Sequence, residues 1–212
     1  MNLPRMTAAT HRRNGSAFEA LCDRVRRCFV CSGMNHVHVL GDVNGPLTAD
    51  VLFVAEAPGR LGAARTGIPM TSDVTGRRFH AFLAEARLAR ERVFVTNSVL
   101  CNPLNTNGNN RRPAAGEVAA CRDFLAAQVA LVRAPVVVPL GGVALEALRR
   151  VAPHEAALAC DVGRAQPWAG PDGRARTLVA LYHPSIQSTL TRPHATQVKD
   201  WRRLGRIVRA AL

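Results

Sequence analysis

The sequence has almost no lysine and no long apolar run. Of its 28 basic residues, Lys199 is the only lysine. No apolar run approaches the roughly 18 residues that indicate a membrane-spanning helix. Residues 1–13 are basic but lack the apolar centre of a signal peptide. We therefore expect a cytoplasmic protein that does not enter a membrane.

Acidic residues are also scarce, at 15 against the 28 basic ones, which gives a formal charge of +13. Such a balance predicts a polyanionic partner, with nucleic acid first and a membrane surface second. A bias in genomic composition would explain the use of arginine in place of lysine, but not the excess of base over acid. A P-loop and a glycine-rich dinucleotide fingerprint are both missing, which argues against a phosphate-ester or nucleotide enzyme.

The pattern of apolar runs predicts the fold. With 212 residues, 48% of them hydrophobic, the chain can bury a core of its own. We expect a disordered basic tail over residues 1–14 and a single domain over residues 15–212. Strands are predicted at residues 51–55, 93–97, 135–140 and 177–182, and helices at about 16–27, 76–86, 113–132, 142–151 and 196–212. This alternation predicts a three-layer α/β/α fold with a central, mainly parallel four-stranded sheet.

Polar residues and glycines directly follow these predicted strands. Glu56, Asn97, Gly141–Gly142 and His183 each come just after a strand's carboxyl end. Open α/β sheets bind their ligands outside the carboxyl ends of the strands, so we expect all four positions on one rim. His183 lies between a buried strand and a proline, a position that favours a functional role over a structural one.

The cysteines indicate a metal site. Six cysteines in a chain expected to be cytoplasmic argue against a disulfide framework. Cys28 and Cys31 have the spacing of a ligand pair, whereas Cys101 and Cys121 are single residues. Four thiolates hold either structural zinc or an iron–sulfur cluster, and the alternative for the two single residues is an ordinary buried thiol. The remaining two, at positions 22 and 160, are expected in the core.

Several features occur along the chain in a fixed order. They are Cys28-x-x-Cys31, Ala55-Glu-Ala-Pro-Gly59, the loop Arg65-Thr-Gly-Ile-Pro-Met-Thr-Ser-Asp-Val-Thr-Gly76, Thr96-Asn97 with Cys101-Asn-Pro103, Cys121, and His183-Pro184-Ser185. Together they resemble the uracil-DNA glycosylase superfamily, on its iron–sulfur branches, families 4 and 5. The resemblance covers the chain from about residue 28 to its end.

The resemblance implies a function and a cofactor. The function is that of a monofunctional uracil-DNA glycosylase, which flips uracil out of DNA, hydrolyses its N-glycosidic bond and leaves an abasic site for base-excision repair. No lysine lies near the motifs to form a Schiff base, so we expect no strand cleavage. The implied cofactor is a [4Fe–4S] cluster on Cys28, Cys31, Cys101 and Cys121. The expected partners are uracil-containing and abasic-site DNA, bound by a monomer.

The chemistry assigns roles to individual residues. The reaction builds negative charge on the departing base, which His183 can stabilise as a donor to a uracil oxygen. Asn97 offers both a donor and an acceptor to the base edge. Glu56 matches the family-4 acid and Asp73 the family-5 acid, and the two have equal claims to activate water. The predicted substrate-binding residues are Ala55, Ala57, Pro58, Gly59, Met70, Asn97 and Ser185.

The sequence also departs from both families. Met70 replaces the phenylalanine that stacks on the flipped base, so an alternative function is a uracil- or abasic-site DNA-binding protein with little or no turnover. The segment between Cys101 and Cys121 is long and contains no histidine, so we do not expect the crosslinking activity of a related branch. Arg111 and Arg112 in this segment, and Arg192 further on, are predicted to contact DNA.

Overall fold

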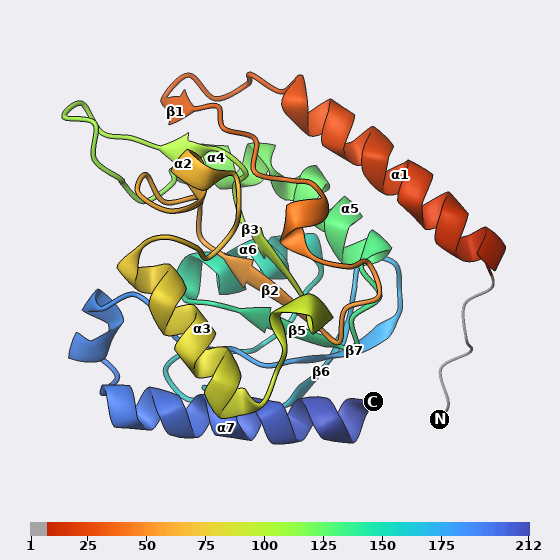
Figure 1. Cartoon of the computed structure of the whole chain (residues 1–212), viewed down its shortest axis with the longest axis vertical. Coiled ribbons are helices and arrows are strands. Elements are labelled where there is room, and N and C mark those ends of the chain that lie inside the picture. Colours follow the sequence, from red (N-terminus) through yellow and green to blue (C-terminus); the bar gives the residue numbers. More distant parts are fainter. Residues whose placement is uncertain (1–7) are drawn as a thin grey trace.

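The computed structural model describes the backbone of residues 8–212 and the side chains from residue 14 onward. At its centre lies a five-stranded sheet with helices on both faces (Figure 1). The strand order is β3 (Val93–Asn97), β2 (Val51–Ala55), β5 (Val136–Pro139), β7 (Ala175–Leu178) and β6 (Gln166–Ala169). The first four are parallel and β6 is antiparallel to β7. The predicted three-layer fold is confirmed, with five strands in the sheet in place of four.

The strand missed by the sequence analysis is β6. Its sequence, Gln-Pro-Trp-Ala, has neither an apolar run nor a clear alternation. It lies at the edge of the sheet, where a proline is tolerated because one side of the strand makes no ladder hydrogen bonds. Such a strand gives only a weak local signal.

The helices form two layers. Their bounds are α1 (Ala8–Arg26), α2 (Ala63–Thr66), α3 (Val74–Ala86), α4 (Ala115–Ala120), α5 (Arg122–Leu131), α6 (Gly142–Val151) and α7 (His194–Ala211), with short 3-10 turns at η1 (Asp42–Asn44), η2 (Arg90–Arg92) and η3 (Gln187–Leu190). One layer contains α1, α5 and α6, and the other contains α3 and α7. A small second sheet pairs β1 (Met34–Asn35) with β4 (Asn102–Pro103).

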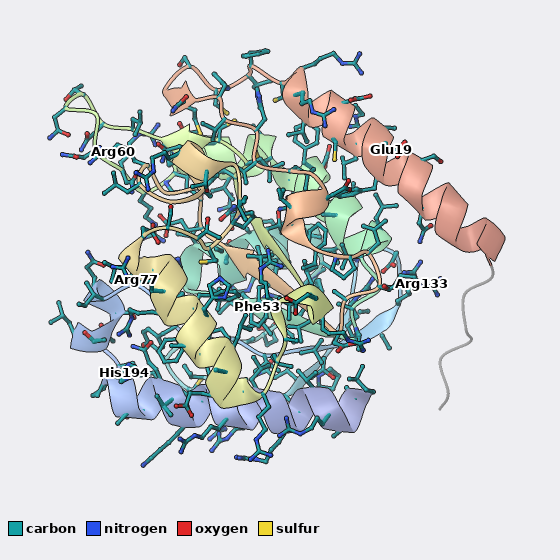
Figure 2. All side chains as sticks on the ribbon, viewed as in Figure 1. Glu19, Phe53, Arg60, Arg77, Arg133 and His194 are labelled. Carbon is teal, nitrogen blue, oxygen red and sulfur yellow. The ribbon has the colours of Figure 1, made fainter. Side chains whose placement is uncertain are left out.

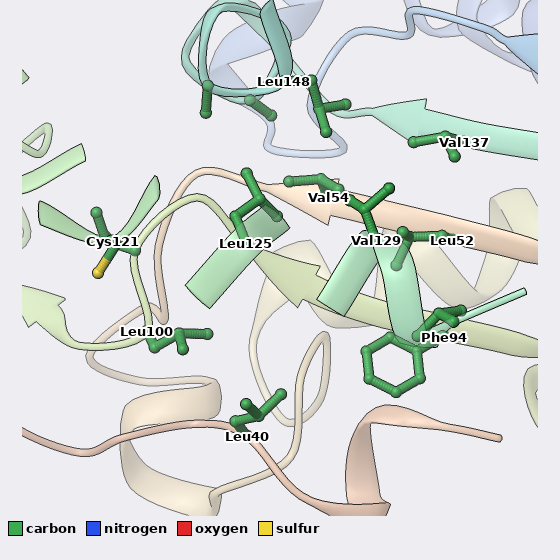
Figure 3. Close-up of a cluster of buried hydrophobic side chains, with 14 of the residues drawn as sticks. Leu40, Leu52, Val54, Phe94, Leu100, Cys121, Leu125, Val129, Val137 and Leu148 are labelled. Atoms are coloured by element: carbon green, nitrogen blue, oxygen red, sulfur yellow. The ribbon is translucent and has the colours of Figure 1, made fainter. Parts of the chain in front are cut away.

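Each face of β2 packs into a different core, because successive side chains of a strand point to opposite faces. Leu52 and Val54 join the core under α5 and α6 (Figure 3). Phe53 faces the other layer, where its ring and that of Phe82 both stack on the Trp201 indole of α7 at centroid distances of 5.4 and 5.3 Å. This double burial explains why β2 is an unbroken apolar run.

Three expected boundaries differ from the structure. The strand predicted over residues 177–182 is β7, which ends earlier, at Leu178. The helix predicted over residues 113–132 is divided into α4 and α5 at Cys121. Residues 8–14, predicted to belong to a disordered tail, are the first turns of α1, and residues 1–7 lie outside the described part of the chain. None of the described helices is long and apolar enough to cross a membrane.

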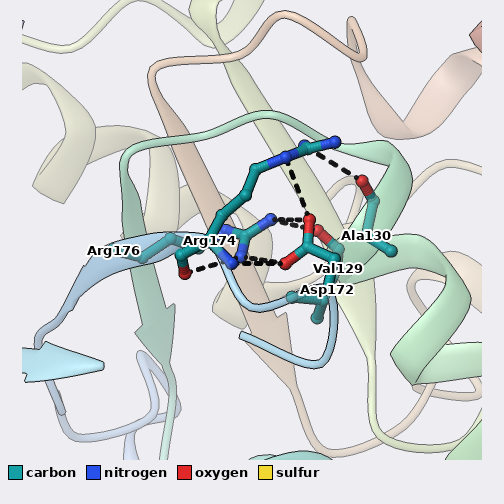
Figure 4. A network of polar contacts seen from close by, with 5 residues as sticks. All are labelled: Val129, Ala130, Asp172, Arg174 and Arg176. Carbon is teal, nitrogen blue, oxygen red and sulfur yellow. Dashed lines mark hydrogen bonds and ion pairs between the residues drawn. The ribbon is translucent and has the colours of Figure 1, made fainter. Parts of the chain in front are cut away.

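Some of the many arginines hold the fold together. The guanidinium of Arg176, whose side chain is 2% exposed, donates to both carboxylate oxygens of Asp172 at 2.6 and 3.0 Å. It also donates to the Val129 carbonyl at 2.9 Å, which ties the β6–β7 turn to α5 (Figure 4). A positive charge in this sequence is therefore not by itself a sign of a DNA contact.

Candidate active site

A cavity of about 320 Å³ lies beyond the carboxyl ends of the parallel strands. Its lining residues are Glu56, Ala57, Pro58, Gly59, Ala63, Pro69, Met70, Asp73, Thr75, Asn97, Asn102, Pro103, Asn110, Arg111, His183, Ser185 and Gln187. All three candidate catalytic residues, Glu56, Asp73 and His183, therefore share one cavity. This is the edge of the sheet at which α/β proteins bind their ligands.

The register of the sheet explains this convergence. Ala55 of β2 is paired with Asn97 of β3, so Glu56 and Asn97 leave neighbouring strands at the same level. A bridge between Leu140 and Leu181 brings the segment after β7 to that edge as well. His183 follows two residues later.

Gly141 packs against His183 without lining the cavity. Its backbone has φ of 92°, in the left-handed region that favours glycine. A Cβ atom at this position would lie 3.5 Å from the His183 Cβ. The Gly141–Gly142 pair, predicted on the rim, thus serves as a turn beside the histidine.

His183 is neutral, and its backbone surroundings define where its proton lies. The Ser185 amide donates to Nδ1 at 3.2 Å, so the neutral ring carries its proton on Nε2. Burial lowers the pKa of His183 to about 4, although the nearby Asp73 charge acts in the opposite direction. The Arg78 Nε–H donates to the Pro184 carbonyl at 2.8 Å and holds this loop to α3. The ring is therefore a neutral N–H donor at physiological pH.

Glu56 is a partly buried carboxylate. Burial raises its pKa above the usual range, and the Arg112 charge partly offsets this effect. Its carboxylate has no hydrogen-bond partner among residues 14–212. A carboxylate of this kind is free to accept a proton from a bound molecule.

Asp73 has a structural role as well as a place in the cavity. It is the N-cap of α3, where its Oδ1 accepts a hydrogen bond from the Gly76 amide at 2.7 Å. Its Oδ2 lies against Gly62, where an added Cβ would approach to 2.6 Å. One oxygen of this carboxylate is thus committed to the fold.

Met70 reaches the cavity from a strained loop. Its φ of 56° is uncommon for a residue other than glycine. A Cβ atom on Gly76 would lie only 2.8 Å from the Met70 carbonyl, so the loop rests directly on the first turn of α3. The position of Met70 therefore depends on the glycine in the helix below it.

Two asparagines of the cavity wall were not predicted from the sequence. The fully buried Asn102 donates from Nδ2 to the Pro58 carbonyl at 2.7 Å and to Asn110 Oδ1 at 3.0 Å. Asn110 Oδ1 also accepts from the Arg60 amide at 2.9 Å. These bonds fasten the long segment after Cys101 to the loop after β2. The only signal for them in the sequence was the crowding of asparagines in this segment.

Three predicted site residues lie outside the cavity. Ala55 is buried in β2, and its carbonyl accepts hydrogen bonds from the amide and the hydroxyl of Ser98. Arg112 does not line the cavity, although its charge acts on Glu56. Arg192 forms a two-bond ion pair with Asp200 at 2.5 and 2.7 Å.

Arg111 lines the cavity, but its guanidinium is fully engaged. It pairs with both Glu117 oxygens at 2.5 and 2.7 Å. It also donates to the carbonyls of Gly33, Leu104 and Arg112. Arg111 is thus a structural clamp between the cavity and the Cys28–Cys31 loop, and has no free donor for a phosphate.

The four predicted ligand cysteines lie near one another. Burial, with a smaller contribution from the nearby Cys28 and Cys31, raises the pKa values of Cys101 and Cys121 to about 11. Cys121 occupies the break between α4 and α5. Of the other two, Cys22 is buried as predicted, whereas Cys160 is exposed, so its placement in the core was wrong.

The sulfurs of these four cysteines are spaced more widely than the ligands of a single zinc ion. Four thiolates around one zinc ion at 2.3 Å would lie about 3.8 Å apart. Among the described residues, the one group of three or more possible ligand atoms within 4.8 Å is His36, His38 and Cys101, so no three of the four sulfurs gather that closely. The four sulfurs therefore do not have the spacing of ligands around a single zinc ion.

A mainly parallel α/β sheet with an acid, an amide and a histidine at its carboxyl edge is an arrangement that can support hydrolysis. The family model of the Uracil DNA glycosylase superfamily matches residues 43–205. The chain belongs to the uracil-DNA glycosylase superfamily. The predicted resemblance is thereby confirmed.

Three relatives called type-4 uracil-DNA glycosylase are similar to the chain. The protein of Thermotoga maritima is 35% identical over 128 residues, which cover 60% of this chain and 63% of the relative. That of Archaeoglobus fulgidus is 29% identical over 202 residues, 89% of this chain and 94% of the relative. That of Saccharolobus solfataricus is 32% identical over 124 residues, 58% and 55% of the two chains. The first and third matches thus span less than two thirds of the relative, and the second nearly all of it.

Proposed function

We propose that this protein is a monofunctional uracil-DNA glycosylase that hydrolyses the N-glycosidic bond of a flipped deoxyuridine and leaves an abasic site. The observation that carries the proposal is the state of His183, a neutral ring whose proton is held on Nε2 by the Ser185 amide at Nδ1. The names of the relatives support uracil as the base.

In this mechanism His183 stabilises the leaving group. Its Nε2–H donates to a uracil oxygen, and the hydrogen bond strengthens as negative charge builds on the base. Because the donor is neutral and already oriented, no proton has to be taken up first. Asn97, whose side chain lies in the same cavity, reads the amide edge of the base.

Glu56 is the better-supported residue for activating water. Its carboxylate is unengaged and its burial makes it more basic, whereas one oxygen of Asp73 caps α3. A base with a raised pKa accepts a proton from water more readily. We assign Asp73 to the shape and negative charge of the pocket, close to the sugar on which positive charge develops.

Hydrolysis without strand cleavage is expected from the position of the single lysine. Lys199 is exposed on α7 and is not among the residues that line the cavity. Among the residues that the structure describes, no amine nucleophile lines the cavity, so water is the attacking group in this proposal.

Cys28, Cys31, Cys101 and Cys121 would hold a [4Fe–4S] cluster as a structural crosslink between the loop after α1 and the start of α5. The spacing of the sulfurs supports this choice over zinc. Iron analysis and visible absorption of the purified protein test it. About four iron atoms per chain are expected, and zinc in place of iron would contradict the assignment. We further propose that the protein is a monomer located in the cytoplasm.

The test of the proposed function is a base-release assay on single- and double-stranded DNA that contains one uracil, with thymine in its place as the control. Uracil release and an intact but alkali-labile strand are expected. Tight binding without release would overturn the proposal in favour of a uracil- or abasic-site DNA-binding protein. The observation that favours this second candidate is Met70 at the position of a stacking ring, because a flexible thioether holds a base less rigidly.

A further inference from the structure

A second cavity, of about 660 Å³, adjoins the first. The two share four residues of their walls, Asp73, Thr75, Asn110 and Gln187. A chain that occupies the second cavity would therefore be continuous with a nucleotide held in the first.

Three arginines from separate segments line this second cavity. Arg60 precedes α2, Arg65 lies in α2, and Arg77 lies in the first turns of α3. All three are exposed, and Asp73 is the one acidic residue that lines the cavity with them. We call this second cavity the arginine cleft.

The guanidinium groups of these arginines are nearly unengaged, in contrast to those of Arg111 and Arg192. The guanidinium groups of Arg65 and Arg77 make no hydrogen bond or ion pair with the residues that the structure describes. Arg60 makes one long contact, 3.4 Å to Asn109 Oδ1. The predicted DNA contacts Arg111 and Arg192 are instead paired with Glu117 and Asp200. An arginine with unoccupied donors can bind a phosphate without first breaking an internal ion pair.

We propose that the arginine cleft holds the DNA backbone next to the flipped nucleotide, with Arg60, Arg65 and Arg77 on its phosphates. This inference rests on the proposed function, since it takes the base to lie in the first cavity. The exposed side chains of Leu61 and Ile186, 53% and 58% exposed, also line the cleft and offer apolar contact to sugars or unstacked bases. A single strand presents both kinds of surface.

An acidic protein segment would also be attracted electrostatically to these three arginines. DNA is favoured because the cleft shares a wall with the cavity that takes the base, and a peptide partner gives no reason for that arrangement. DNA carries phosphates whose charge can be removed one at a time, whereas an acidic peptide carries none. An experiment that removes the charge of single phosphates therefore distinguishes the two ligands.

The first experiment measures the affinity of the whole protein for a uracil-free single-stranded oligonucleotide against salt concentration. Log K falls as log salt rises, and each phosphate contact contributes about 0.7 to the steepness of this fall. The variant R60A/R65A/R77A should therefore make the slope shallower by about 2. The control is Arg133→Ala, which removes one charge on the opposite side of the molecule from Arg60 and Arg77 (Figure 2) and should leave the slope unchanged. A triple variant with the wild-type slope would overturn the proposal.

A triple lysine variant and a set of modified oligonucleotides test the proposal even if the triple alanine variant folds poorly. A triple lysine variant retains the charges and should keep most of the slope. Neutral methylphosphonates placed one at a time beside the uracil should weaken binding to the wild-type protein, and much less to a single variant such as Arg77→Ala. Equal weakening in both would contradict a contact between this cleft and those phosphates.

The outcomes also separate this inference from the proposed function. A protein that shows the arginine-dependent slope but releases no uracil would refute the glycosylase proposal and leave a DNA-binding cleft. A protein that releases uracil with a slope independent of these arginines would refute the cleft alone.

Discussion

The base cavity and the cysteine region lie side by side but are built in different ways. Three key side chains of the cavity lie at strand ends, so the sheet itself brings Glu56, Asn97 and His183 together. The cysteines come from the loop after α1, the residue before β4 and the break between α4 and α5, which meet only in the tertiary structure. The hydrogen bonds of the sheet therefore position the key side chains of the cavity. The cysteine region has no such shared element, and its arrangement depends on contacts between separate segments.

Arg111 is the junction between these two regions. It lines the cavity, while its guanidinium binds the carbonyl of Gly33 in the loop that follows Cys31. It also pairs with Glu117, one helical turn before Cys121. We therefore expect substitutions in the cavity to change the rate of catalysis, and substitutions in the cysteine region to change the stability of the protein.

The largest effect is expected on the cysteine side. Cys121→Ser should abolish the bound iron, because a cluster needs all of its ligands and its binding contributes to folding. A loss of several kcal/mol would lower the melting temperature by about 10 °C or more for a chain of this size. The exposed Cys160 is the matched control, and Cys160→Ser should change neither iron content nor melting temperature. Full iron content in Cys121→Ser would show that this thiol is not a ligand.

The next effect is catalytic. Glu56→Gln should lower the single-turnover rate of base release by about 10²- to 10⁴-fold, as expected on losing a general base. Asp73→Asn should cost less, because asparagine also caps helices well. Both variants should keep their iron and melting temperature. A larger rate loss for Asp73→Asn than for Glu56→Gln would reverse the assignment of the acid.

The dependence of the rate on pH sharpens this assignment. A base must be ionised to act, so the rate should rise with pH through the pKa of Glu56 and then level off. Since burial raises that pKa, the rise should occur at a higher pH than for an exposed carboxylate, and it should be absent in Glu56→Gln. His183, with its pKa lowered to about 4, should add no step between pH 5 and 8, a range set by the ordinary titration of histidine. A step near pH 6.5 that disappears in a His183 variant would contradict a neutral donor.

Removing the donor itself should have a somewhat smaller effect. His183→Ala is expected to slow base release by about 10²- to 10³-fold, the cost of losing one donor to a developing anion. The loss should be smaller for a base with a better leaving group, such as 5-fluorouracil, because such a base depends less on the donor. An equal loss for both bases would point to a structural role for the histidine.

The smallest expected effect lies at the junction. Arg111→Met should lower stability by about 1–3 kcal/mol, because Glu117 and the carbonyls bound by Arg111 lose their partner. Its neighbour Arg112 makes no such side-chain contacts among the described residues, so Arg112→Met should leave the free energy of unfolding unchanged. Denaturant unfolding of the two variants measures the difference. Equal stability would show that the clamp is not needed to hold the two regions together.

Much of the fold could be predicted because its signals are local. Strands β2, β3 and β5 are buried along their whole length, and the sequence shows them as apolar runs. The edge strand β6 and the break at Cys121 have no such signal, since they depend on a neighbouring strand and on the packing of α4 and α5. Helices and strands were therefore predicted well where burial is symmetric and poorly where it is not.

The residues of the candidate site were likewise predicted in part. Glu56, Asn97 and His183 were predicted because a strand end is visible in the sequence. Asn102 was missed because its role arises from contacts with distant segments. Arg192 was predicted to bind DNA, but a turn of the chain into α7 places it against Asp200.

The sequence by itself determined the family, the layered α/β architecture and the order of the residues along the rim, because motifs and apolar runs are properties of neighbouring residues. Only the tertiary structure decided the protonation state of His183, the commitment of Asp73 to a helix cap, and which arginines remain free. Each of these depends on burial and on hydrogen-bond partners far away in the chain, and these exist only after the chain has folded.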